Sequence, residues 1–160
     1  MNNKNEIHFR KANATDIDII WEIIQQSIER RRKDGSDQWQ NGYPNLQTIE
    51  SDVEKGFGHV LTVNNDVAVY VALIFNDEPA YSSIEGAWLT TGEFVVVHRV
   101  AVSENFAGQR LAKKLFDCIE DFTKSQNVLS IKVDTNYDNL AMLKILESKG
   151  YSYCGEVVLA

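Results

Sequence analysis

The alternation of apolar and polar residues divides the chain into short strands and helices. Alternating or continuous runs of β-branched residues indicate strands, and apolar residues recurring every three or four positions indicate helices. In chain order, the pattern predicts a strand at 7–12, helices at 17–32 and 45–55, strands at 59–63, 67–75 and 94–102, a helix at 111–124, a strand at 130–134, a helix at 139–148 and a strand at 151–159. This order is typical of a mixed α/β fold.

Local signals sharpen several of these boundaries. Thr15, followed by Asp18 three residues later, is predicted to start the first helix. Asn64-Asn65-Asp66 favours a tight turn, so the strands on either side of it are predicted to form a hairpin. Residues 76–92 make a long irregular segment with several aromatic side chains, which is typical of binding loops.

Composition and charge exclude several classes of partner. The chain has 160 residues, which suits one domain at 1–160, and its net charge of −7 disfavours nucleic acid. The longest apolar run, Val67–Phe75, is too short to span a bilayer, and the polar residues 1–6 do not resemble a secretory signal. We therefore expect no membrane partner and a cytoplasmic location, which also suits the two cysteines. The basic run Arg30–Lys33 is predicted to be the solvated end of a helix.

Three common enzyme signatures and a metal site find no support in the sequence. It contains no phosphate-binding loop of nucleotide hydrolases, no dinucleotide-binding glycine fingerprint and no Gly-x-Ser-x-Gly elbow. His8, His59 and His98 are scattered and share no helical i, i+4 spacing with another ligand. Each histidine is expected to be structural rather than a metal ligand.

The most distinctive local feature is a strand that turns through a glycine into a helix. It reads Val100-Ala101-Val102-Ser103-Glu104-Asn105-Phe106-Ala107-Gly108-Gln109-Arg110-Leu111. Free backbone N–H groups at such a helix start, together with the helix dipole, would receive a diphosphate. An ordinary turn explains the glycine equally well, so the residues alone leave both interpretations open.

This run resembles the cofactor signature of the GNAT superfamily of N-acetyltransferases. In that family a strand ending Val-x-Val leads through Gln/Arg-x-x-Gly-x-Gly/Ala into a helix, and residues 107–112 correspond to the hexapeptide. Residues 139–142 and 146–151 resemble the family's Asn-containing helix and its Glu-Lys-x-Gly-Phe ending. The resemblance covers nearly the whole chain. It implies a three-layer fold with a largely antiparallel mixed sheet, splayed at the cofactor site and covered by helices on both faces.

The resemblance implies that acetyl-CoA is the cosubstrate. The strand residues would lie along the pantetheine arm, the N–H groups at the helix start would surround the diphosphate, and Asn139 would face the pantetheine from the last helix. The implied cofactor residues are Val100, Ala101, Val102, Ala107, Gly108, Gln109, Arg110, Leu111, Ala112, Lys113 and Asn139. Two positions depart from the family, because Ala107 replaces Gln/Arg and Arg110 replaces the middle glycine. Arg110 either crowds the loop or supplies a cation to a phosphate.

The general base of many relatives is a glutamate in the strand before the loop, and Val96 stands at that position here. In a regular strand His98 would share a face with Val96 and Val100, and its ordinary pKa near 6.5 suits a base at neutral pH. His98 is therefore a candidate catalytic base, with a packed core histidine as the alternative. Glu93, at the strand entrance, is the second candidate, as a base or as an attractor of the cationic amine.

The family's tyrosine that protonates the departing thiolate corresponds to Leu146 here. Tyr137, near the same helix start, is a candidate substitute, and an exposed loop tyrosine is the alternative. The aromatic and acidic residues of two irregular segments are predicted to bind the acceptor: Trp39, Tyr43, Tyr81, Glu85 and Trp88.

The predicted reaction is direct transfer of an acetyl group from acetyl-CoA to a primary amine of a small molecule or peptide. Because the usual base, the usual acid and parts of the hexapeptide differ, the alternative is a catalytically weak acyl-CoA-binding module with the same fold. The chain ends after one final predicted strand, where the family usually forms a further hairpin. The sheet edge is then either open or completed by a second copy in a homodimer.

Overall fold

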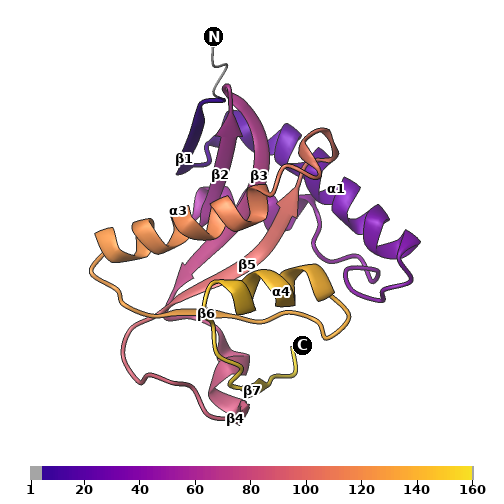
Figure 1. The fold of residues 1–160 in the computed structure, drawn as a ribbon. Helices are drawn as coiled ribbons and strands as arrows, with labels where there is room; N and C mark the ends of the chain where they lie inside the picture. The colour runs from indigo at the N-terminus through magenta and orange to yellow at the C-terminus, as the bar shows by residue number, and fades with distance from the viewer. Residues whose placement is uncertain (1–4, 160) are drawn as a thin grey trace.

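Five strands form one mixed sheet in the computed structural model, which describes residues 5–159 (Figure 1). Their order in the sheet is β1 (Ile7–Lys11), β2 (Gly58–Val63), β3 (Asp66–Phe75), β5 (Val95–Val102) and β6 (Ile131–Val133). Neighbouring strands are antiparallel except β5 and β6, which run parallel. The predicted hairpin is confirmed, since Asn64 and Asn65 both adopt positive φ angles of 50° and 72° in the turn between β2 and β3.

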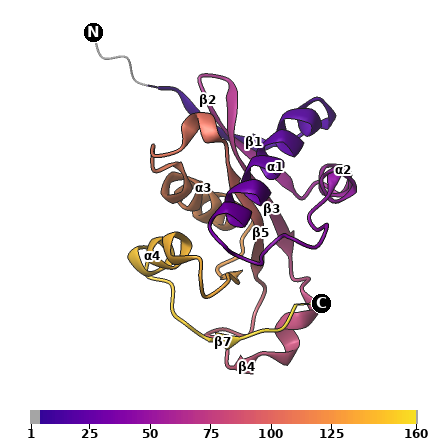
Figure 2. The ribbon, with the colours of Figure 1, turned by 90° about the vertical axis from the view of Figure 1, so that its right-hand side faces the viewer.

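Helices cover both faces of this sheet, as Figure 2 shows in profile. On one side lie α1 (Ile17–Lys33) and α2 (Leu46–Glu54), and on the other α3 (Leu111–Ser125) and α4 (Leu140–Ser148). Ile20, Ile23 and Ile24 of α1 are fully buried in the first core, and Leu115 with Phe116 of α3 in the second. Each such side chain contributes about 1.5–3 kcal/mol through its burial. The three-layer mixed α/β fold is thereby confirmed.

Asparagines start three of the helical segments. The side chains of Asn45 and Asn139 accept hydrogen bonds from the backbone N–H groups of Thr48 and Met142, and so cap α2 and α4. Before α1, the cap is Asn13, whose side chain accepts from Thr15 N–H at the start of a 3₁₀ turn, η1 (Ala14–Asp16). The prediction that Thr15 starts this helix was therefore wrong, because Asn13 and Asp16 form the reciprocal capping box two residues earlier.

A β-bulge interrupts β5 at Arg99. Tyr70 pairs with Ala101 and Ala72 pairs with His98, so Arg99 and Val100 together face one residue of β3. Arg99 has a φ of 55°, which permits the extra residue. The bulge moves Val100 onto the α3 and α4 face, while His98 stays on the opposite face. The expectation that His98 and Val100 share a face, which assumed a regular strand, was therefore wrong.

The predicted strand at 151–159 is also wrong in extent. Only β7 (Gly155–Glu156) forms, and it pairs with β4 (Glu85–Gly86), after the 3₁₀ turn η2 (Pro79–Ser83), as a small sheet below the main one (Figure 1). The segment passes β4 so closely that a Cβ at Gly86 would lie 2.1 Å from the Cys154 carbonyl oxygen. Within the described residues β6 remains an edge strand, so pairing with a second copy is still a prediction.

No helix among residues 5–159 is long and apolar enough to cross a membrane. The sequence argument about a secretory signal rests mostly on residues 1–4, and the argument about the sheet edge refers to Ala160. Both lie outside the described range.

The close approach of Gly86 and Gly155 predicts that Gly155→Ala will disrupt the pairing of β7 with β4. A Cβ at Gly155 would lie 2.2 Å from the Glu85 carbonyl oxygen, and its φ of 146° disfavours any side chain. Hydrogen exchange of the Ala87 amide, which donates to the Cys154 carbonyl at 3.0 Å, should accelerate at least about tenfold. The melting temperature should fall by less than about 5 °C because this contact lies outside both cores. Gly92→Ala, where a Cβ meets nothing within 4 Å, is the matched control. Unchanged exchange at Ala87 in the Gly155 variant would contradict the assignment.

Candidate active site

The parallel strands β5 and β6 pair over only three residues and then separate. Val95, Val96 and Val97 face Ile131, Lys132 and Val133, and no further pair follows in the described residues. A cavity of about 640 Å³ opens where the strands diverge. Its lining residues are Arg31, Gln38, Trp39, Tyr43, Ile74, Glu78, Pro79, Ala80, Val97, His98, Arg99, Val100, Val133, Asp134, Thr135, Asn139, Met142, Val158 and Leu159. This volume suits a small ligand or the reactive end of a longer one.

His98 and Glu78 contact each other in the wall of this cavity. The Nε2 atom of His98 lies 3.0 Å from Oε2 of Glu78, and both side chains are largely buried. Burial lowers the pKa of His98 below its ordinary value of 6.5, an effect that Asp134 and Glu78 offset only in part and that Arg99 reinforces. His98 is therefore a neutral imidazole at pH 7, which can accept a proton.

Arg99, the bulged residue, is neutralised within the protein. Its guanidinium donates to both carboxylate oxygens of Asp52, at 2.9 and 2.6 Å, and to the hydroxyl of Tyr43 at 2.6 Å. Tyr70 donates to the same carboxylate at 2.6 Å, and burial together with Asp52 raises the pKa of Tyr70 so that it stays protonated. This network ties β5 to α2 and holds Tyr43 at the cavity wall.

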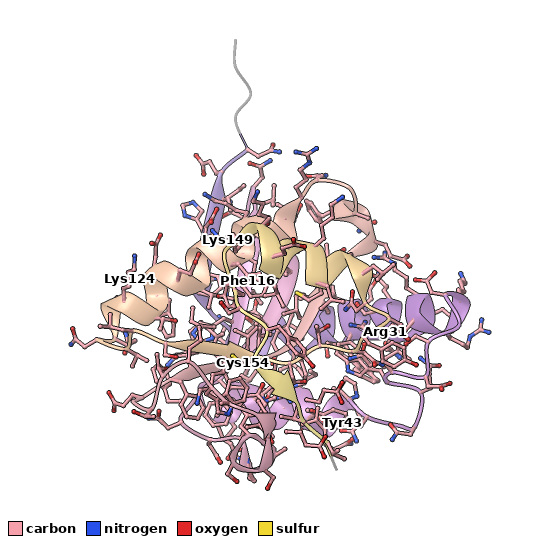
Figure 3. All side chains as sticks on the ribbon, turned by 60° about the horizontal axis from the view of Figure 1, so that its bottom comes forward. Arg31, Tyr43, Phe116, Lys124, Lys149 and Cys154 are labelled. Atoms are coloured by element: carbon pink, nitrogen blue, oxygen red, sulfur yellow. The ribbon has the colours of Figure 1, made fainter. Side chains whose placement is uncertain are left out.

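The residues predicted to bind the acceptor divide into two groups. Trp39 and Tyr43 line the large cavity, and Tyr43 lies on the same side of the molecule as Arg31 at the end of α1 (Figure 3). Tyr81 and Trp88 instead border a separate cavity of about 330 Å³, and Glu85 borders neither.

Tyr81 and Trp88 have evident structural contacts. Tyr81 is 3% exposed and donates to Asp134 at 2.5 Å, and the indole N–H of Trp88 donates to the Tyr81 carbonyl at 3.0 Å. Their rings pack 4.9 Å apart. The hydrogen bond from Tyr81 thus holds Asp134 in the wall of the large cavity.

The other two catalytic candidates lie away from His98. Glu93 is exposed in the loop before β5, and Tyr137 is 85% exposed before α4. Neither lines the large cavity. Of the three residues considered for acid or base chemistry, the structure brings only His98 into it.

The loop after β5 leaves the start of α3 open. Gly108 has a φ of 83° and Arg110 a φ of 57°, and Arg110 precedes α3 without a side-chain cap. The first N–H groups of a helix have no partner within the helix, and α3 lacks the asparagine that caps α2 and α4. The predicted positions Ala107, Gly108, Gln109, Arg110 and Lys113 are all exposed around this start.

The remaining predicted cofactor residues lie at the large cavity, in one of the two cores or half-buried on α3. Val100 and Asn139 line the large cavity, Val102 and Leu111 pack in the core beneath α3 and α4, and Ala101 lies in the opposite core under α1. Ala112 is half-buried on α3. Asn139 also caps α4 with its carbonyl oxygen, so its amide N–H₂ group is the part left for a ligand.

Sequence reasoning missed the four charged side chains that line this cavity: Arg31, Glu78, Arg99 and Asp134. Only Asp134 had a local signal, as a polar residue at the end of a predicted strand. The basic run was predicted to be solvated, and that is wrong for Arg31, which lines the cavity. Among residues 5–159, no group of three or more His, Cys, Asp and Glu side chains could hold a metal ion.

Comparison with known proteins identifies the family. The model described as the acetyltransferase (GNAT) family matches residues 20–151. The uncharacterized N-acetyltransferase YesJ of Bacillus subtilis (strain 168) is 28% identical over 145 residues, which cover 88% of this chain and 78% of that protein.

Solved structures agree with the family match. A GNAT-family acetyltransferase from Streptococcus agalactiae superposes with a TM-score of 0.87 and 34% identity, covering 96% of this chain and 89% of that one. An aminoglycoside N-acetyltransferase in complex with CoA shares the fold at 13% identity, with a TM-score of 0.70 and coverage of 100% and 97%. Because the family model spans most of the chain and a relative matches it in both sequence and fold, this chain belongs to the GNAT family of acetyltransferases.

Proposed function

We propose that the protein transfers the acetyl group of acetyl-CoA directly to a primary amine of a small molecule or peptide. The observation that carries this proposal is the His98–Glu78 pair, buried in the cavity where β5 and β6 separate. Acetyl-CoA is the acyl donor, as membership of the acetyltransferase family implies. Its thioester end belongs in this cavity, and its diphosphate belongs at the uncapped start of α3.

The separation of the strands suits the pantetheine arm. Where β5 has no partner strand on the β6 side, its backbone groups are free to bond an amide-containing chain. Val100 lines this opening from β5 and Asn139 and Met142 line it from α4. The bulge at Arg99 turns the side chain of Val100 toward this side.

His98 supplies the base for the acceptor. An alkylammonium has a pKa of about 10 and must lose a proton before its nitrogen can attack the thioester carbonyl. Oε2 of Glu78 accepts a hydrogen bond from Nε2–H of His98, which leaves Nδ1 as the basic nitrogen. One proton of the alkylammonium passes to His98, directly or through water, before the nitrogen attacks. The new C–N bond then forms as the C–S bond breaks, the CoA thiolate departs, and the second proton that the nitrogen loses goes to solvent.

The thiolate does not require a protein acid. A thiol with a pKa of about 8.5 leaves readily as its anion and takes a proton from solvent. Leu146 occupies the place of the family's tyrosine, and Tyr137 is exposed to solvent outside the cavity. The reaction therefore depends on the base more than on an acid.

The loop after β5 predicts that Gly108→Glu will abolish CoA binding. A carboxylate at this position repels the diphosphate, and the φ of 83° disfavours any side chain. Calorimetric titration with CoA should give a clear affinity for the wild type, with thermal stabilisation of about 2.7 kcal/mol at a hundredfold excess over Kd. Gly92→Glu, in an open loop position, is the control for added charge. If the wild type shows no stabilisation at millimolar CoA, both the enzyme and the binding-module interpretations fail.

The His98–Glu78 pair predicts how turnover depends on pH. Because the pKa of His98 is lowered, kcat should fall as pH drops through an apparent pKa below 6.5 and should reach a plateau above it. His98→Gln should lower kcat by about 10²–10⁴ while CoA affinity stays unchanged. Glu78→Gln removes a carboxylate that raises the pKa of His98, so the acid limb should shift to still lower pH. Unchanged turnover in His98→Gln removes this residue from the mechanism, and silence of the wild type across amines, with CoA bound, favours the binding module.

A further inference from the structure

Arg31 brings a positive charge to the cavity without an acidic partner. Its Nε donates to the side chain of Gln38 at 3.2 Å, and its Nη1 donates to the Ser27 carbonyl at 3.3 Å. Arg10, Arg32 and Arg99 each pair with a carboxylate, whereas Arg31 forms no ion pair within residues 5–159.

The surroundings of Arg31 make this unpaired charge costly. Burial lowers its pKa to about 10, neighbouring Arg30 acts in the same direction, and Asp138 opposes them without forming an ion pair. The side chain nevertheless stays protonated at neutral pH. A half-buried charge of this kind is stabilised when a ligand brings the opposite charge.

The guanidinium of Arg31 is held in a fixed plane. Its central carbon lies 3.7 Å from the centroid of the Trp39 ring, an arrangement that favours a stacked arginine. Trp39 itself has a φ of 64°, which a bulky residue rarely adopts. The Gln40 side chain, which donates to the Ile28 carbonyl at 2.9 Å, anchors this loop to α1. The remaining N–H groups of Arg31 are thus oriented before any ligand arrives.

The cavity therefore has two electrically different sides. Glu78 and Asp134 lie beside His98 and attract a cationic amine, while Arg31 offers N–H donors that its contacts with Gln38 and Ser27 do not use. Arg99 differs from Arg31 because it forms an ion pair with Asp52. A ligand with an amine at one end and an anionic group at the other matches both sides.

Arg31 lies apart from the proposed site of the cofactor diphosphate. The proposed diphosphate site is the loop at Gly108 and the start of α3, and none of residues 103–113 lines the cavity that contains Arg31. An anionic group that binds Arg31 would therefore come from a ligand in the cavity rather than from the diphosphate.

We propose that the acceptor is an amine that also carries a carboxylate, such as an amino acid or a short peptide acid, and that Arg31 binds this carboxylate. This inference rests on the function proposed above. The planar guanidinium matches a carboxylate in geometry as well as in charge. Polycationic acceptors are disfavoured, because they would place further positive charge beside Arg31 and Trp39.

The test compares each amino acid with its own carboxamide as acceptor, since the two differ in the carboxylate charge. The wild type should prefer the acid by about 10- to 100-fold in kcat/KM, and Arg31→Gln should bring that ratio close to one. Arg31→Gln should lower kcat/KM for the acids far more than for the carboxamides. Arg32→Gln, one residue away and paired with Glu29 on the surface, is the matched control and should keep the wild-type ratio.

Binding is measured in parallel, so that the result does not depend on turnover. Titration of the same acids and carboxamides into the CoA complex should show the same preference and the same loss in Arg31→Gln. Equal use and binding of acids and carboxamides by the wild type overturns the inference, as does a loss of CoA affinity in Arg31→Gln. A preference for polyamines, or for phosphate-bearing amines over carboxylates, also overturns it. Failure of the proposed function appears separately, as CoA that does not bind or as acceptors that bind without turnover.

Discussion

The bulge at Arg99 and its ion pair with Asp52 are the constraint on which the site depends. One extra residue in β5 turns His98 and Val100 to opposite faces of the sheet. Arg99 then pairs with Asp52 of α2, which is 4% exposed and also accepts a hydrogen bond from the hydroxyl of Tyr70. Removing one partner of such a buried pair costs about 3–5 kcal/mol, because the other charge is left unpaired. Strand β5, which carries His98 and Val100, is therefore fixed to α2.

In the proposed reaction, this arrangement places the cofactor and the acceptor amine on opposite faces of β5. Val100, beyond the bulge, points toward the opening beside α4, where a pantetheine arm fits. His98, before the bulge, stays on the other face beside Glu78, where an amine can be deprotonated. In a regular strand both side chains would compete for one face.

The net charge on each side of the cavity depends on which charged side chains have a partner of opposite charge. Asp52 neutralises Arg99, and the hydroxyl of Tyr81 satisfies one oxygen of Asp134. Arg31 differs because its contacts are a glutamine, a carbonyl group and an aromatic ring, none of which cancels its charge. The distribution of partners, rather than the number of charges, gives the cavity an acidic side and a basic side.

Local sequence patterns determined most of the fold and the position of the loop at Gly108 before α3. Helix periodicity, the asparagine turn and the strand leading to Gly108 all act between residues a few positions apart, so they can be read from the chain directly. The prediction of a strand at 151–159 was wrong in extent because this segment pairs only with β4, where Gly86 and Gly155 from distant parts of the chain lie in close backbone contact. Only the tertiary structure decided which residues line the large cavity. Glu78 meets His98 across 20 positions, and Arg31 lies beside a cavity that no helical pattern reveals, because burial and charge pairing depend on contacts between residues distant in the chain.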